Sequence, residues 1–175
     1  ILSGVYHGIT LGSPIAMIIR NADSRPEDYD LLKDVYRPSH ADFTYQAKYG
    51  IRDHRGGGRS SARETAARVM AGSIAKMLLK KIGISVNGYV SAIGGIQLNK
   101  SYTELNLSNT ESNSVRCPDD EAATRMISAI ETAKAEGDSL GGIVSCVVTG
   151  LLPGLGEPVF DKLHAQLGKA MLSIN

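Results

Sequence analysis

One stretch near the middle of the chain, residues 61–81, restricts the possible folds more than any other feature. It opens on a Ser-Ala-Arg-Glu capping box, in which the Ser61 hydroxyl accepts the backbone N–H of Glu64 and the Glu64 carboxylate reaches back. Gly83 suits the left-handed position that follows the last turn of a helix. Small residues occupy several faces of the first half, so other elements can approach closely on more than one side. We therefore predict a long helix at the centre of the fold.

Segments with the character of strands surround this helix. Residues 2–6, 14–19, 85–93, 95–98 and 142–148 are rich in apolar or β-branched side chains. Helical patterns cover residues 27–32, 41–49, 118–136 and 159–172. Because hairpins and helices are interleaved, the sequence predicts an α+β fold with largely antiparallel strands. We expect residues 142–148 to form a buried strand and residues 1–175 to form a single domain.

The charge nearly cancels over the whole chain but is concentrated in one segment. The 19 Lys and Arg against 18 Asp and Glu give a net charge of +1, which argues against general attraction to nucleic acid or an acidic membrane. Between Lys48 and Arg68, however, six cations face only two acids, Asp53 and Glu64. This basic segment leaves a non-catalytic anion- or RNA-binding module as the alternative function, although few aromatic residues other than tyrosine accompany it.

Several other classes of protein are disfavoured by the composition. Two cysteines cannot build a disulfide framework and indicate a reducing compartment, so we expect a cytoplasmic location. No apolar run reaches the ~18 residues that cross a bilayer, and no His, Cys or acidic residues have convincing metal spacing. We therefore predict that the protein does not associate with a membrane and does not bind a metal ion. The chain begins at Ile1 without Met and stops at the end of a helical pattern, so we expect an internal piece of a longer protein.

The best candidate for a ligand site is the glycine-rich segment in front of the long helix. Residues 56–58 are three consecutive glycines, which allow close approach of backbone N–H groups, and a helix N-terminus offers further free donors. Arg59 and Arg63 can grip a phosphate or carboxylate, and Ser60 and Ser61 add hydroxyls. A Walker loop needs Lys where Arg59 stands, and no apolar strand precedes the glycines as a dinucleotide fingerprint requires. The segment predicts binding of a phosphorylated small molecule; the alternative is a flexible loop with a solvated rim.

His40 is the best candidate for proton transfer. Arg37 precedes it and the basic glycine segment follows it, and a histidine in such a place can exchange protons near neutral pH. The alternative is a packed turn histidine with no chemical role. The other three histidines lack such neighbours.

These residues carry a pattern that resembles the chorismate synthase family. The matching blocks are Tyr-Arg-Pro-Ser-His-Ala-Asp-Phe-Thr-Tyr at 36–45, Lys-Tyr-Gly-Ile-Arg-Asp at 48–53, the glycine segment at 56–65, Glu-Gly-Asp-Ser-Leu-Gly-Gly at 136–142, Gly-Leu-Gly-Glu-Pro-Val-Phe-Asp at 154–161 and Met-Leu-Ser-Ile-Asn at 171–175. They follow one another in the family's order over nearly the whole chain. Blocks of this length in this order identify the chain as similar to that family.

The resemblance implies a fold and a reaction. The fold is a β-α-β sandwich, in which long central helices lie between mainly antiparallel sheets, and it assembles as a homotetramer. The reaction is the conversion of 5-enolpyruvylshikimate 3-phosphate to chorismate by a 1,4-anti elimination of phosphate, in the shikimate pathway to aromatic amino acids. The implied cofactor is reduced FMN, and the resemblance leaves open whether NADPH reduces it in the same protein.

The resemblance also assigns roles to individual residues. His40 matches a catalytic histidine that handles protons next to the flavin. The remaining matches are Arg59, Ser60 and Ser61 to a flavin-binding triplet, Asn175 to a further flavin contact, and Ala62 and Arg63 to substrate contacts. The family's N-terminal Gly-Glu-Ser-His-Gly block with its other catalytic histidine, its N-terminal arginines and the blocks that follow Asn175 have no counterpart here. We therefore expect the 175 residues to be inactive alone.

Overall fold

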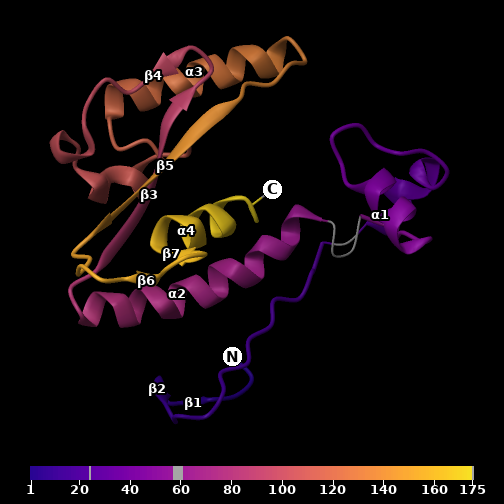
Figure 1. Ribbon diagram of the computed structural model, residues 1–175. Helices are drawn as coiled ribbons and strands as arrows, with labels where there is room; N and C mark the ends of the chain where they lie inside the picture. Colours follow the sequence, from indigo (N-terminus) through magenta and orange to yellow (C-terminus); the bar gives the residue numbers. More distant parts are fainter. Residues whose placement is uncertain (24, 57–60, 175) are drawn as a thin grey trace. The chain divides into compact units, whose positions relative to one another are not determined.

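The computed structural model describes residues 1–23, 25–56 and 61–174, which form two compact units. One unit comprises Ile1–Ala75 and Gly154–Asn175, and the other comprises Lys76–Pro153. The helix α2 (Thr65–Lys81) begins in the first unit and ends in the second (Figure 1). None of the helices among the described residues is both long and apolar enough to cross a lipid bilayer. Arg59, Ser60 and Asn175, which were predicted to bind the cofactor, lie outside the described residues.

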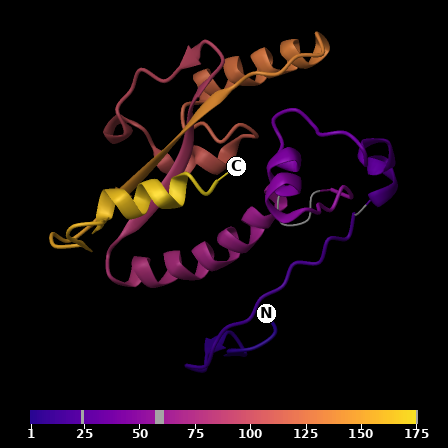
Figure 2. The same cartoon turned by 45° about the vertical axis from the view of Figure 1, so that its right-hand side comes forward.

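The Lys76–Pro153 unit is a three-stranded antiparallel sheet with one long helix. The strands follow the order β4-β3-β5, with β3 at Ser85–Ile93, β4 at Ile96–Gln97 and β5 at Gly142–Thr149. Ser85 pairs with Thr149 and Val90 with Val144, and the register shifts between Val90 and Ala92. Two 3-10 helices, η4 (Tyr102–Glu104) and η5 (Leu107–Ser112), precede the helix α3 (Asp120–Ala135). Figure 2 shows β5 running alongside β3 with α3 next to the sheet.

The buried core of this unit forms where α3 meets the sheet. Cys117, Ala122, Ala123 and Met126 are buried together, and Val90, Ile93, Ile96, Leu98 and Val115 pack against them. Asp119 caps α3, because its side chain accepts the backbone N–H of Ala122 at 2.9 Å. Small alanines on the inner face let the helix approach the strands closely, so the core is compact although few large side chains contribute.

The other unit is built from short elements. A hairpin of β1 (Val5–Tyr6) and β2 (Ile9–Thr10) comes first, followed by the 3-10 helix η1 (Pro26–Leu32) and the helix α1 (Asp42–Tyr49). The 3-10 turn η3 (Ala62–Glu64) leads directly into α2, and β6 (Gly156–Glu157), β7 (Asp161–Lys162) and α4 (Leu163–Met171) close the unit. No hydrophobic side chain among its described residues is buried, whereas Asp42 is only 1% exposed.

The α+β class and its antiparallel strands are confirmed, but three local predictions are wrong. The predicted strand at residues 14–19 does not form: the Leu2 N–H donates to the Ala16 carbonyl, but the Ala16 N–H donates to the Ser3 hydroxyl and not to a backbone carbonyl, so no ladder continues. The first strand pairs with Ile9–Thr10 instead. The strand at 142–148 forms but is not buried: Ile143 is 56% and Val144 65% exposed. The reason is that β5 is an edge strand, and the core at α3 draws on β3 and β4 instead.

The third wrong prediction is the capping box at the start of the long helix. Residues 62–64 form a tight 3-10 turn, so the Ser61 hydroxyl accepts the N–H of Arg63 at 3.3 Å, and the N–H of Glu64 bonds to the Ser61 carbonyl. The Glu64 carboxylate pairs with Arg68 at 2.7 Å instead of reaching back. Gly83 does take the predicted left-handed conformation, with φ of 81°.

Candidate ligand site

The turn that carries His40 is closed by one carboxylate. The Asp42 side chain accepts the backbone N–H of Arg37 at 3.1 Å and the Arg37 guanidinium twice at 2.9 Å, from Nε and from Nη2. This two-pronged contact is the strong geometry for an arginine and a carboxylate. It lowers the pKa of Asp42 to about 2, chiefly through the Arg37 side-chain hydrogen bond, against the opposing effect of burial. Asp42 is therefore ionised at neutral pH.

His40 is exposed at the tip of this turn, and its ring orientation is fixed by a hydrogen bond. Its Nδ1 lies 2.9 Å from the Pro38 carbonyl oxygen. Since a carbonyl can only accept, Nδ1–H donates and Nε2 is the nitrogen left available. The preceding residue, Ser39, has a left-handed backbone with φ of 55°. The histidine is thus held at the corner of a constrained turn.

Arg52 links this turn to the preceding 3-10 helix η1. Its Nη2 donates to the carbonyls of Leu32, Lys33 and Val35 at 3.1, 2.7 and 2.8 Å. Its Nη1 lies 3.9 Å from the Asp42 carboxylate, and its side chain is only 8% exposed. Arg52 therefore satisfies the carbonyls at the end of η1, where a cation is favoured.

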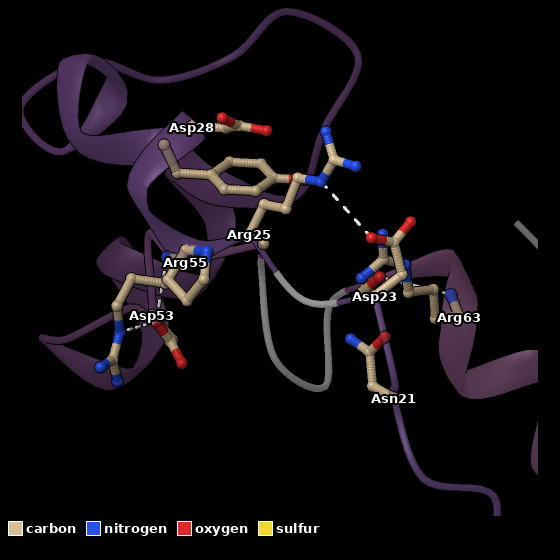
Figure 3. Close-up of a pocket in the computed structure, with 11 residues that line it drawn as sticks. Asn21, Asp23, Arg25, Asp28, Asp53, Arg55 and Arg63 are labelled. Carbon is tan, nitrogen blue, oxygen red and sulfur yellow. Dashed lines mark hydrogen bonds and ion pairs between the residues drawn. The ribbon is translucent and has the colours of Figure 1, made fainter.

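Two adjoining cavities lie around this turn and the start of the long helix. A cavity of about 490 Å³ is lined by His40, Ser61 and Ala62, together with Tyr29, Arg37, Ser39, Ala41 and Gly56. A second cavity of about 520 Å³ is lined by Arg63 and again by Ser61, Tyr29 and Gly56. Figure 3 shows Arg63 beside Asn21 and Asp23, with Arg55 held by Asp53. Its described lining carries three arginines and three carboxylates; Arg25 pairs with Asp23 and Arg55 with Asp53, and Arg63 and the Ser61 hydroxyl are further donors for a ligand.

The structure brings together four of the predicted site residues. His40, Ser61 and Ala62 line one cavity, and Arg63 lines the adjoining one. Arg59, Ser60 and Asn175 were predicted as cofactor contacts and lie outside the described residues. Sequence reasoning missed Tyr29 as a lining residue, and nothing in its local sequence marks it. It also missed Asp42 as the partner of Arg37, although opposite charges five positions apart across a Pro-Ser turn are a usable signal.

The basic segment is largely engaged in contacts within the chain. Arg52 bonds to backbone carbonyls, Arg55 pairs with Asp53 at 3.2 Å, and Arg68 pairs with Glu64. The Arg68 guanidinium also donates to the Ser173 carbonyl at 2.5 Å. These contacts reduce the charge available to a polyanion, which counts against the alternative of an RNA-binding surface. Over the part of the chain that the structure describes, no three His, Cys, Asp or Glu residues gather as metal ligands.

The described fold and site define an α+β protein in which an imidazole, a serine hydroxyl and arginines gather around adjoining cavities. Comparison with known proteins gives a consistent result. The family model of chorismate synthase matches residues 1–175, and the chain belongs to this family. A chorismate synthase from Cytophaga hutchinsonii is 59% identical over 175 residues, covering 100% of this chain and 49% of that protein. One from Christiangramia forsetii is 60% identical over 174 residues, again covering 49% of that protein.

A crystal structure of chorismate synthase shares the fold with a TM-score of 0.78 and 32% sequence identity, covering 99% of this chain and 52% of the other. The expectation of a chorismate synthase-like α+β fold with mainly antiparallel strands is therefore confirmed. The chain spans about half the length of the curated relatives that it matches.

Proposed function

We propose that this chain supplies part of the active site of a chorismate synthase, a carbon–oxygen lyase of the shikimate pathway. The substrate would be 5-enolpyruvylshikimate 3-phosphate, which loses phosphate and a proton in a 1,4-anti elimination to give chorismate. The observation that carries the proposal is that a family match over all 175 residues coincides with one cavity lined by His40, Ser61 and Ala62.

The residues that line the two cavities suit a flavin cofactor and a phosphorylated substrate. The Ser61 hydroxyl and the Arg63 guanidinium are donors for phosphate oxygens, and Arg59 and Ser60 would add to them. Asn175 would contact the same cofactor. Reduced FMN, when bound, would supply an electron transiently and help to remove the substrate proton, so that no net redox change results. Ala62 and Arg63 would contact the substrate.

His40 would hold and transfer a proton at Nε2, because its Nδ1–H is already committed to the Pro38 carbonyl. Arg63 would orient the phosphate that leaves, and Ser61 would hold the cofactor. The cavity wall near His40 also carries Tyr29, Ala41 and Ala62.

The wider setting of the proposed enzyme follows from its family and is part of the same proposal. We infer a cytoplasmic homotetramer that acts on a small molecule and on neither nucleic acid nor membranes, and in which the 175 residues are the core of one longer domain. Because the chain spans about half of each curated relative, we also infer that these residues alone do not catalyse the reaction.

The proposal is tested by an anaerobic assay of chorismate formation with reduced FMN, using a family-length protein that contains these residues. His40→Ala should lower turnover by ~10²–10⁴-fold with little change in melting temperature, as expected for a positioned acid–base group. The matched control is His164→Ala, because His164 is an exposed histidine on α4 outside both cavities. No chorismate from the unaltered protein, or normal turnover of the His40→Ala variant, would contradict the proposal. Tighter binding of an RNA oligomer than of FMN would favour the alternative.

A further inference from the structure

Asp42 is not among the lining residues of either cavity, yet it organises the turn that carries His40. Within the described part of the chain, its three hydrogen bonds all come from Arg37: the backbone N–H at 3.1 Å, Nε at 2.9 Å and Nη2 at 2.9 Å. Its side chain is 2% exposed, and no hydrophobic side chain is buried beside it among the described residues of this unit. A carboxylate is costly to bury unless it is paired and hydrogen-bonded, and the Arg37 contact meets that requirement. We name residues 37–42, closed by this contact, the Asp42 clamp.

The geometry of His40 depends on atoms that the Asp42 clamp holds. The His40 backbone N–H donates to the Arg37 carbonyl at 3.4 Å, and His40 Nδ1–H donates to the Pro38 carbonyl at 2.9 Å. Between them Ser39 has φ of 55°, a conformation that persists in a residue with a side chain only where the surroundings impose it. Without the clamp this turn can relax, and the Pro38 carbonyl then no longer selects which ring nitrogen of His40 carries the proton.

Arg52 connects the Asp42 clamp to the end of the preceding 3-10 helix η1. Its Nη1 lies 3.9 Å from the Asp42 carboxylate, while its Nη2 is held by three backbone carbonyls of residues 32, 33 and 35. The Asp42 clamp is therefore fixed through Arg52 to the backbone carbonyls at the end of η1 and just after it.

We infer that Asp42 is a positioning residue, which acts through Arg37 to keep the His40 ring in the Nδ1–H form with Nε2 free to exchange protons with a bound ligand. This inference rests on the proposed function of His40. The low pKa of Asp42, about 2, keeps the clamp ionised at every pH at which such an enzyme would work.

The test compares the unaltered family-length protein with Asp42→Asn and with Met126→Ala. Asp42→Asn keeps the side-chain size but cannot accept the two-pronged contact of Arg37. Met126→Ala removes a fully buried side chain in the other compact unit, so it lowers stability without touching the turn. The readouts are turnover in the presence of reduced FMN and the ¹⁵N NMR spectrum of selectively labelled histidine.

We expect Asp42→Asn to lower kcat by about 10²-fold, the typical cost of a small misplacement of a catalytic group, with a much smaller change in KM. The His40 spectrum should change from the Nδ1–H form to an average of both tautomers. Met126→Ala should lose thermal stability and keep the His40 spectrum and kcat of the unaltered protein. In an Arg37→Gln background, Asp42→Asn should have little further effect, because Asp42 acts through Arg37.

An Asp42→Asn protein that keeps the unaltered His40 spectrum, or that loses stability but not kcat, would overturn the inference. If that variant does not fold, Arg37→Lys keeps the charge without the two-pronged contact and must show the same spectral change. A failure of the proposed function is recognised separately, because the unaltered protein would then make no chorismate while the NMR comparison still decides whether Asp42 sets the tautomer of His40.

Discussion

At the residue scale, Asp42 makes the stability of the chain depend on pH in a defined direction. The contact with Arg37 lowers its pKa from 3.8 to about 2. Because the folded-state pKa is below the unfolded value, the stabilisation is fully present above pH ~4 and is lost as the pH falls through about 2. The difference corresponds to about 2 kcal/mol in the free energy of unfolding. Urea unfolding measured from pH 6 down to pH 2 checks this value.

The matched comparison is the same titration of Asp42→Asn. Asp53 and Asp119 also have lowered pKa values, from hydrogen bonds to Arg55 and Lys100, so the unaltered chain and the variant both lose stability in acid. Only the Asp42 contribution should differ between them, and the variant should show the shallower decrease. Two parallel curves would mean that the Arg37 contact does not lower the pKa of Asp42 in solution.

Some features of the candidate site could be predicted from the local sequence, and others depend on how distant segments fold together. His40 and Ser61 could be predicted, because a histidine beside cations and a serine between glycines and a helix are informative by residue type alone. The cavity that joins them could not, because it requires residues 37–41 to fold back toward residue 61. The burial of Arg52 could not be predicted either. In the sequence this residue counts as a free cation, but in the structure it donates to three backbone carbonyls.

At the scale of single elements, the N-terminus of α3 illustrates what a cap contributes. Asp119 accepts the Ala122 N–H at 2.9 Å and pairs with Lys100 at 2.6 Å. Asp119→Ala should lower the free energy of unfolding by about 1 kcal/mol, mainly through loss of the cap. Asp119→Asn is the control, because it keeps a capping oxygen and loses only the pair with Lys100, whose side chain is mostly exposed and screened by water. Chemical denaturation of the three proteins measures the two losses of stability. Equal losses in both variants would mean that the charge of Asp119, and not its cap, stabilises the protein.

Element boundaries were predictable where a residue type imposes them. Gly83 ends α2, and Asp119 begins α3, as the sequence indicates. The start of α2 was not predictable, because a Ser-x-x-Glu pattern is compatible with both a capping box and a 3-10 turn. The structure has the turn at Ser61 and forms its capping box at Ser101 and Glu104 instead. The exposure of β5 could not be predicted from the sequence either, since an apolar run does not show whether a strand is central in a sheet or at its edge.

At the scale of the whole molecule, the two compact units differ sharply in what holds them together. Every buried hydrophobic side chain among the described residues lies in the Lys76–Pro153 unit, between Ile84 and Ala133. That unit also has the long β3–β5 pairing from Ser85 to Ile93. The other unit has short elements around the ion contacts of Asp42. Because burial of apolar area is the dominant favourable term in folding, the two units should not open with equal ease.

We therefore expect hydrogen exchange in the isolated 175-residue chain to be slowest in β3, β5 and the inner face of α3, and much faster in η1, α1 and the hairpin of β1 and β2. Exchange measured by mass spectrometry at several times checks this order peptide by peptide.

Met126→Ala removes a fully buried side chain from the α3 core and should cost about 2–5 kcal/mol, so exchange should accelerate in β3 and α3. Exchange in residues 26–49 should already be fast and change little, because their protection does not come from that core. Equal protection of both units, or an effect of Met126→Ala that spreads evenly over the chain, would instead mean that the 175 residues open as one cooperative body.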